Sequence, residues 1–154
     1  MTAIDSGLVT GMSGAGRTQA LKALEDAGFE ALDNLPITLI ASALATATPG
    51  RPMAIGVDIR TRGFAPGAVS AVLAAQREGS AQRMSLLFID CDDDVLVRRF
   101  TETRRAHPFA ADRSVADGLA VERRLLADVK DAADAIVDST LMTPHDLRRF
   151  VVGR

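Results

Sequence analysis

One glycine-rich segment constrains the fold of this chain more than any other part of the sequence. It reads Gly11-Met12-Ser13-Gly14-Ala15-Gly16-Arg17-Thr18 and follows the phosphate-binding pattern G-x-x-x-x-G-K-[ST], with Arg17 in place of the lysine. The run Gly7–Thr10 ahead of it predicts a β-strand, and the apolar residues behind it lie at helical spacing up to Gly28. Because a P-loop occupies the turn between a strand and a helix, the segment predicts an α/β domain.

Each residue type in this loop has a physical reason. Glycines let successive backbone N–H groups converge on phosphate oxygens, and the positive end of the following helix faces the same place. The hydroxyl of Thr18 is expected to bind Mg²⁺. Arg17 is longer and forked where the usual lysine is a compact charge, so we expect nucleotide binding to be retained and hydrolysis to be slow.

Carboxylates accompany two apolar runs that read as central strands of a sheet. Asp58 lies in the run Met53–Ile59, and Asp90 ends the next such run. Since ligands of open α/β sheets bind beyond the carboxyl ends of the strands, one of these acids is expected to help hold Mg²⁺. Asp90, directly after its apolar run, has the stronger signature and is predicted as a metal ligand with Thr18 and as catalytic with Arg17. A helix cap or a solvated strand end remains the alternative for both.

Short apolar runs alternate with longer amphipathic stretches along the chain. Together with the glycine-rich segment, this rhythm predicts a P-loop NTPase-like three-layer sandwich, in which a mostly parallel five-stranded sheet has helices on both faces. Strands are expected at residues 7–10, 29–32, 53–59, 84–90 and 135–137. Helices are expected to begin near residues 17, 36, 68, 92, 115 and 144, with Ser114 and Thr143 as N-caps of the last two.

Charge and composition exclude several classes of protein. The 18 basic and 20 acidic residues give a net charge of −2, so no global field attracts nucleic acid or an anionic membrane. The single cysteine, Cys91, rules out an internal disulfide and any multi-cysteine metal site. No signal peptide or membrane-spanning stretch is recognisable, and the protein is expected to be cytoplasmic.

Positive charge is concentrated in one stretch of the sequence. Of the 18 basic residues 16 are arginines, and seven of these fall between positions 98 and 124. Arg98, Arg104 and Arg105 are predicted to bind the nucleotide as a phosphate clamp, with a solvated helix face as the alternative. His107 is expected at the surface, with closure over a nucleotide as its alternative.

Several motifs together resemble the RapZ family of RNase adapter proteins, or YvcJ-like P-loop proteins, over nearly the whole chain. The matching motifs are Gly11–Thr18, Ala23–Gly28, Asp33–Pro36, Val57–Arg60, Phe88–Asp92, Arg98–Phe100 and Thr103–Pro108. The resemblance implies a regulatory protein that binds ATP and GTP and has weak Mg²⁺-dependent NTPase activity. It also implies that residues 11–18 form the ATP segment and Asp58-Ile59-Arg60-Thr61 the GTP segment. Thr61 stands where Asn is frequent in the family, and Arg17 where Lys is frequent.

The same resemblance bears on domains and partners. Family members carry a second, C-terminal domain associated with RNA or metabolite binding, and this sequence ends at Arg154. We therefore expect residues 1–154 to form one nucleotide-binding domain, whose nucleotide state is read by a C-terminal domain or a partner protein. RNA binding is not expected of this chain alone, because six Phe and no Tyr or Trp supply few stacking platforms. The sequence leaves the oligomeric state open.

Two other functions remain open at this point. The P-loop, Asp33 after the second strand and the arginine-rich stretch also resemble the layout of nucleoside and shikimate kinases, so a small-molecule kinase is the alternative enzyme class. A scaffold that keeps the loop without binding nucleotide is the other. Phosphate transfer to an acceptor would distinguish the kinase, and failure of Mg-ATP and Mg-GTP to stabilise the fold would distinguish the scaffold.

Overall fold

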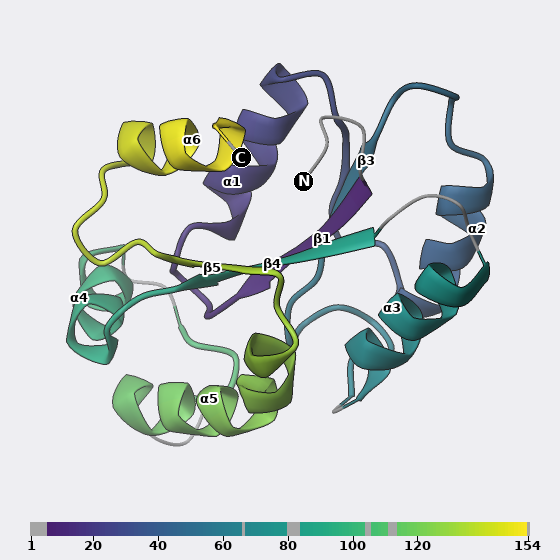
Figure 1. The fold of residues 1–154 in the computed structure, drawn as a ribbon. Coiled ribbons are helices and arrows are strands. Elements are labelled where there is room, and N and C mark those ends of the chain that lie inside the picture. Colours follow the sequence, from purple (N-terminus) through teal and green to yellow (C-terminus); the bar gives the residue numbers. More distant parts are fainter. Residues whose placement is uncertain (1–5, 66, 80–83, 104–105, 111–113, 154) are drawn as a thin grey trace.

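The computed structural model describes residues 6–65, 67–79, 84–103, 106–110 and 114–153. The strands form one parallel sheet in the order β2-β3-β1-β4-β5, with β1 at its centre (Figure 1). The predicted α/β class and five-stranded sheet are therefore confirmed. The elements follow one another as β1 (Ser6–Gly11), α1 (Arg17–Asp26), β2 (Glu30–Leu32), the 3₁₀ turn η1 (Ile37–Leu39), α2 (Ile40–Ala45), β3 (Met53–Gly56), α3 (Ala68–Gly79), β4 (Met84–Asp90), α4 (Asp93–Thr103), α5 (Val115–Asp131), β5 (Ala135–Asp138) and α6 (Pro144–Val152).

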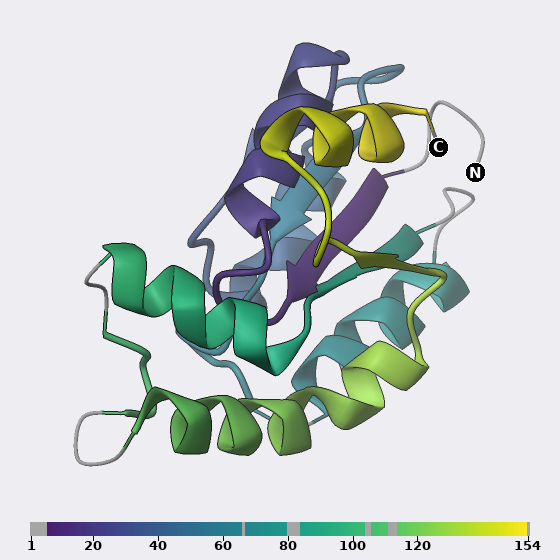
Figure 2. The ribbon, with the colours of Figure 1, turned by 90° about the vertical axis from the view of Figure 1, so that its left-hand side faces the viewer.

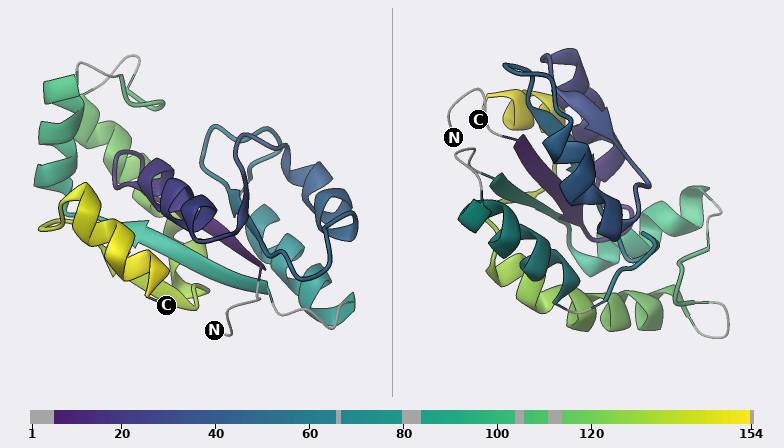
Figure 3. Two further views of the ribbon diagram at one scale, coloured as in Figure 1. Left: turned by 90° about the horizontal axis from the view of Figure 1, so that it is seen from above. Right: turned by 90° about the vertical axis from the view of Figure 1, so that its right-hand side faces the viewer.

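Helices cover both faces of this sheet, as the predicted three-layer arrangement requires. α1 and α6 pack side by side on one face, and α3 and α5 lie on the other (Figure 1, Figure 3). Leu8 of β1, Ile55 of β3 and Phe88 of β4 are at most 1% exposed, because the central strands are covered from both sides. No helix in the described part of the chain is long and apolar enough to cross a membrane.

The helix α4 stands apart from these layers. It lies beyond the carboxyl ends of β1 and β4, beside the loop that joins β1 to α1 (Figure 2). A Cβ atom built on Gly14 of that loop would lie 3.2 Å from the ring of Phe100 and 3.6 Å from a methyl group of Leu96. The buried face of α4 therefore forms one wall of the P-loop.

The helices that flank the P-loop begin as the sequence predicts. The hydroxyl of Ser114 accepts a hydrogen bond of 3.1 Å from the N–H of Asp117 at the start of α5. At the start of α6, Thr143 and Asp146 form a capping box, in which each side chain accepts a hydrogen bond from the other residue's N–H. These caps fix the residues at which α5 and α6 begin.

One strand is shorter than expected. β3 was predicted to reach Ile59, but it ends at Gly56 because the next residues form a tight turn. The N–H of Asp58 donates to the hydroxyl of Thr61 over 2.9 Å, and the N–H of Arg60 donates to the Asp58 carboxylate over 2.8 Å. Backbone groups that would have continued the ladder are satisfied within the turn, which holds Asp58 at the carboxyl edge of the sheet.

Candidate functional site: the phosphate-binding loop

The loop between β1 and α1 has a backbone that glycine alone suits. Gly11, Gly14 and Gly16 have φ angles of +152°, +87° and +125°, which side-chain-bearing residues rarely adopt. At Gly11 a Cβ atom would also lie 2.1 Å from the carbonyl oxygen of Ile89 in β4. The glycines are therefore required by conformation and by the close approach of β4.

The carbonyl groups of this loop are held by neighbouring elements. The Arg99 guanidinium donates to the carbonyl of Gly14 over 2.9 Å, and the Ser139 hydroxyl donates to the carbonyl of Ala15 over 2.5 Å. Among the described residues, the N–H groups of Gly14 and Gly16 donate to no protein acceptor. The first N–H groups of α1 also lack an intrahelical acceptor. The loop thus presents unpaired donors of the kind that bind oxyanions.

Arg17, at the start of α1, is engaged by two carboxylates. Its Nη1 contacts Oδ1 of Asp33, which follows β2, and its Nη2 lies 3.1 Å from Oδ2 of Asp58, which follows β3. The side chain of Asp58 is 12% exposed and that of Asp33 34% exposed. The fork of Arg17 therefore bridges two strand ends beside the loop. Thr18, the predicted Mg²⁺ ligand, is exposed in the same first turn.

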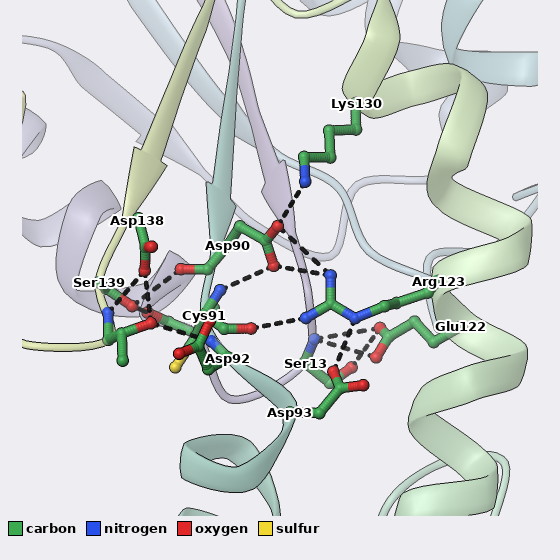
Figure 4. Close-up of polar contacts among 12 residues, drawn as sticks. Ser13, Asp90, Cys91, Asp92, Asp93, Glu122, Arg123, Lys130, Asp138 and Ser139 are labelled. Carbon is green, nitrogen blue, oxygen red and sulfur yellow. Dashed lines mark hydrogen bonds and ion pairs between the residues drawn. The ribbon is translucent and has the colours of Figure 1, made fainter.

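Asp90, the other predicted site carboxylate, is surrounded by cations from α5 (Figure 4). Lys130 Nζ lies 2.8 Å from its Oδ2, and Arg123 Nη1 lies 3.0 Å from its Oδ1. Burial by itself would raise the pKa of the Asp90 carboxyl, but hydrogen bonds from Lys130 and the Cys91 N–H, with the nearby guanidinium, hold that pKa below its ordinary value. Both oxygens of Asp90 thus already face positive charge.

The lowered pKa of Asp90 predicts a loss of stability in acid. A carboxyl whose pKa is lower in the folded state stabilises the fold above its unfolded-state pKa of about 3.9, and this contribution disappears as the pH falls through the folded-state pKa. Asp90→Asn is expected to lower the free energy of unfolding at neutral pH by about 1–2 kcal/mol and to make its decline in acid shallower. Urea unfolding across the acidic range tests this, and a decline as steep as the parent's would contradict it.

Of the predicted arginine clamp, only Arg98 lies within the described residues, so the clamp stays a prediction. Arg98 is exposed on α4, whereas its neighbour Arg99 reaches the P-loop. Arg104 and Arg105 lie outside the described residues. The signal for Arg99 was its position three residues after the buried Leu96, on the side of α4 that faces the loop.

Two further residues, which had not been predicted at the site, lie behind the loop: one contacts it and the other contacts the first. Glu122 of α5 is fully buried and hydrogen-bonded to the backbone and the hydroxyl of Ser13. His107, expected at the surface, is 2% exposed and contacts Glu122. A signal for Glu122 existed, because it lies three residues after Leu119 and four before Leu126, on the apolar face of its helix.

The predicted GTP segment, Asp58-Ile59-Arg60-Thr61, is the turn that ends β3. Thr61 is 6% exposed, and its hydroxyl accepts the Asp58 N–H inside the turn. Ile59 is half-buried and Arg60 exposed. In this conformation the segment's internal hydrogen bonds set the position of the Asp58 carboxylate.

A groove of about 400 Å³ opens beside the P-loop, between α4 and the start of α6. Most of its lining is apolar, and its polar residues are Gln19, Arg99, Thr103, Ser139 and Thr143. Its volume lies within the range of small-ligand sites. The lining residues are Gly14, Ala15, Gly16, Gln19, Arg99, Phe100, Thr103, Ser139, Met142, Thr143, Pro144 and Leu147.

The sequence is similar to that of a known domain family. The family model described as the RapZ-like N-terminal domain matches residues 4–154. A nucleotide-binding protein of Paramagnetospirillum magneticum is 52% identical over 147 residues, which cover 95% of this chain and 48% of that protein. A nucleotide-binding protein of Rhodospirillum rubrum is 50% identical over 149 residues, which cover 94% and 46%. The chain therefore spans just under half the length of these relatives.

Solved structures with a similar fold include small-molecule kinases. The shikimate kinase of Acinetobacter baumannii, in complex with shikimate, has a TM-score of 0.63 at 15% identity, covering 97% of this chain and 92% of that chain. A gluconokinase of Sinorhizobium meliloti has a TM-score of 0.61 at 14% identity, covering 97% and 90%. At such low identity the likeness concerns the fold, and it confirms the P-loop NTPase-like architecture.

Proposed function

Because the chain belongs to the RapZ-like N-terminal domain family, we propose that it is a cytoplasmic regulatory module that binds ATP or GTP with Mg²⁺ and hydrolyses them slowly. One observation carries this proposal: the carbonyls of Gly14 and Ala15 are bonded to protein, while the N–H groups of Gly14 and Gly16 are not, within the described residues. Unpaired N–H groups at a helix N-terminus suit the oxygens of a triphosphate. The printed name of the relatives, nucleotide-binding protein, supports the same ligand class.

The groove beside the loop is suited to the nucleoside. It begins at Gly14 and Gly16, so a triphosphate on the loop would direct its base toward the apolar walls formed by Phe100 and Met142. Purine bases are flat, and their faces gain from leaving water for an apolar groove. Both ATP and GTP fit this description, which leaves the choice between them to experiment.

Magnesium would supply positive charge that neutralises the phosphates. No group of three or more His, Cys, Asp or Glu side chains in the described ranges could hold a metal alone, so the ion would rely on phosphate, water and one or two protein oxygens. Thr18 and Asp58 fit this role, because Thr18 lies in the first turn of α1 and Asp58 pairs with Arg17 of the same turn. Asp90 remains our other predicted ligand, but it pairs with two cations of α5, whereas among the described residues Asp58 pairs with Arg17 alone, so Asp58 is favoured.

Slow hydrolysis follows from how Arg17 is held. The Arg17 guanidinium bridges Asp33 and Asp58. To stabilise the charge that develops on a reacting phosphate, it must first break at least one of these ion pairs, which slows the reaction. The nucleotide state would then last long enough to be read by a C-terminal domain or a partner protein. RNA binding by this chain alone is not part of the proposal.

Nucleotide titration of the parent and two glycine variants tests the proposal. Gly16→Ala is expected to weaken Mg-ATP binding by at least about tenfold, because alanine is strained at a φ of +125° and its Cβ would lie 2.6 Å from Leu147. Gly28→Ala is the control, since Gly28 also has a positive φ, +106°, but no atom lies within 4 Å of its added Cβ. Calorimetry should show parent-like affinity for that control. If the parent binds neither Mg-ATP nor Mg-GTP, the scaffold alternative holds.

The alternative function, a small-molecule kinase, is favoured by one contact. Asp33 lies beside Arg17 at the carboxyl edge of the sheet, where an acceptor hydroxyl would meet the terminal phosphate. A kinase transfers phosphate to its acceptor faster than to water. We expect a panel of sugars, nucleosides and hydroxy acids to leave the rate of ATP consumption unchanged, and an acceleration by any of them would support the kinase instead.

A further inference from the structure

A buried carboxylate, that of Glu122, contacts Ser13 of the P-loop. Glu122 is 0% exposed, and its oxygens lie 3.1 and 3.2 Å from the backbone nitrogen of Ser13 and 2.7 Å from the Ser13 hydroxyl (Figure 4). A carboxylate only accepts hydrogen bonds, and both groups of Ser13 are donors to it. Charge-assisted bonds of this kind are about twice as strong as neutral ones and have strict geometry. Glu122 therefore fixes the position of Ser13.

His107 holds Glu122 from the other side. Its Nε2 lies 2.9 Å from Oε1 of Glu122, and its Nδ1 accepts the N–H of Phe109 over 3.0 Å. Because Nδ1 is an acceptor, the ring proton lies on Nε2 and is donated to the carboxylate. The ring rests against Gly118, where a Cβ would lie 2.8 Å from Nδ1. The imidazole is thus held in one orientation.

The same imidazole also supports the wall formed by α4. The rings of Phe100 and His107 meet edge to face with centroids 5.3 Å apart, and Phe100 lies against Gly14 of the loop. Arg123, next to Glu122, donates to the carbonyl of Cys91 over 2.6 Å and so fastens α5 to the end of β4. Two neighbouring loop residues, Ser13 and Gly14, are therefore supported by side chains that both rest on His107.

We propose that Glu122 is a positioning residue of the nucleotide site, which shapes the P-loop for the triphosphate through Ser13, with His107 as its anchor. This inference rests on the nucleotide binding proposed above. Because the Ser13 N–H donates to Glu122, the N–H groups free to bind phosphate begin at Gly14. Preorganised donors bind an anion more tightly than donors that must first be ordered, so the effect appears as affinity for the triphosphate.

Glu122→Gln tests this with little change in shape. The amide introduces a donor facing donors from Ser13 and His107, so Mg-ATP affinity is expected to fall about tenfold. Displacement of a fluorescent ATP analogue, measured well below the unfolding temperature, reports this affinity. If Glu122 merely stabilised the fold, its substitution would lower the unfolding temperature and leave the affinity for Mg-ATP unchanged. Glu78→Gln, the same substitution at an exposed position of α3, is the control and should match the parent.

A second variant keeps the test decisive if Glu122→Gln does not fold. His107→Phe retains a ring against Phe100 but removes the donor to Glu122, and is expected to weaken binding about threefold. Combining Glu122→Gln with Ser13→Ala should weaken binding by less than the product of the single effects, because both act through one contact. Parent-like affinity in both Glu122→Gln and His107→Phe would overturn this inference and leave the proposed function standing. A parent that binds no nucleotide would overturn it together with the proposed function.

Discussion

Alanine in place of Gly11 is expected to destabilise the domain by about 4 kcal/mol or more, beyond the range of ordinary substitutions. The added Cβ would lie 2.1 Å from the carbonyl oxygen of Ile89 and 2.8 Å from its nitrogen, and both atoms belong to the backbone of β4. Backbone cannot rotate aside as a side-chain end can, so β1 and β4 must separate where their ladder ends. Urea unfolding followed by circular dichroism measures the loss. A variant with the parent's midpoint would contradict this account of the loop.

The control for Gly11→Ala is alanine at a glycine with open surroundings. Gly50 has a φ of +80°, and no atom lies within 4 Å of a Cβ built there. Gly50→Ala therefore isolates backbone strain, which costs about 1–2 kcal/mol. The difference between the two variants measures the close approach of β4 to the loop. A cost at Gly50 equal to that at Gly11 would mean that strain explains both.

The sheet could be predicted from the sequence because its signals are local. A strand covered on both faces needs a continuous apolar run, and the run predicted at 84–90 is β4 from Met84 to Asp90. Helix starts at Ser114 and Thr143 were readable because a cap and its partner lie three residues apart. The prediction for β3 was wrong at its end because Asp58 and Thr61 satisfy each other in a turn that apolar content does not reveal.

The contacts around the loop could not be predicted, because they join distant parts of the chain. Ser13 and Glu122 are 109 positions apart, and no local pattern says which donor a buried acid will meet. Arg98 and Arg99 differ by one position, about 100° around the helix, and only packing of α4 decides which reaches the loop. The apolar run before Asp90 indicated a strand end but not the cations that α5 brings to it.

Lysine in place of Arg17 is expected to raise the rate of ATP hydrolysis by about tenfold or more, equivalent to about 1.4 kcal/mol of transition-state stabilisation. The Arg17 fork engages Asp33 and Asp58 at once, a geometry that one compact ammonium cannot reproduce. The shorter side chain is therefore freer to follow the charge that develops on the outer phosphates. Nucleotide affinity should change by less than about threefold, since the loop N–H groups are unaltered. Single-turnover hydrolysis and calorimetry on the same samples measure both quantities.

The control for Arg17→Lys is the same exchange in another ion pair. Arg148 pairs with Asp26 over 2.6 Å between side chains that are both half-exposed, so Arg148→Lys should leave hydrolysis unchanged. Asp33→Asn with Arg17 retained removes one of the two carboxylate contacts, and is expected to give an intermediate rate if those contacts restrain the guanidinium. A parent that hydrolyses ATP as fast as Arg17→Lys would show that the bridged guanidinium does not limit the reaction. The persistence of the bound state would then need a different physical cause.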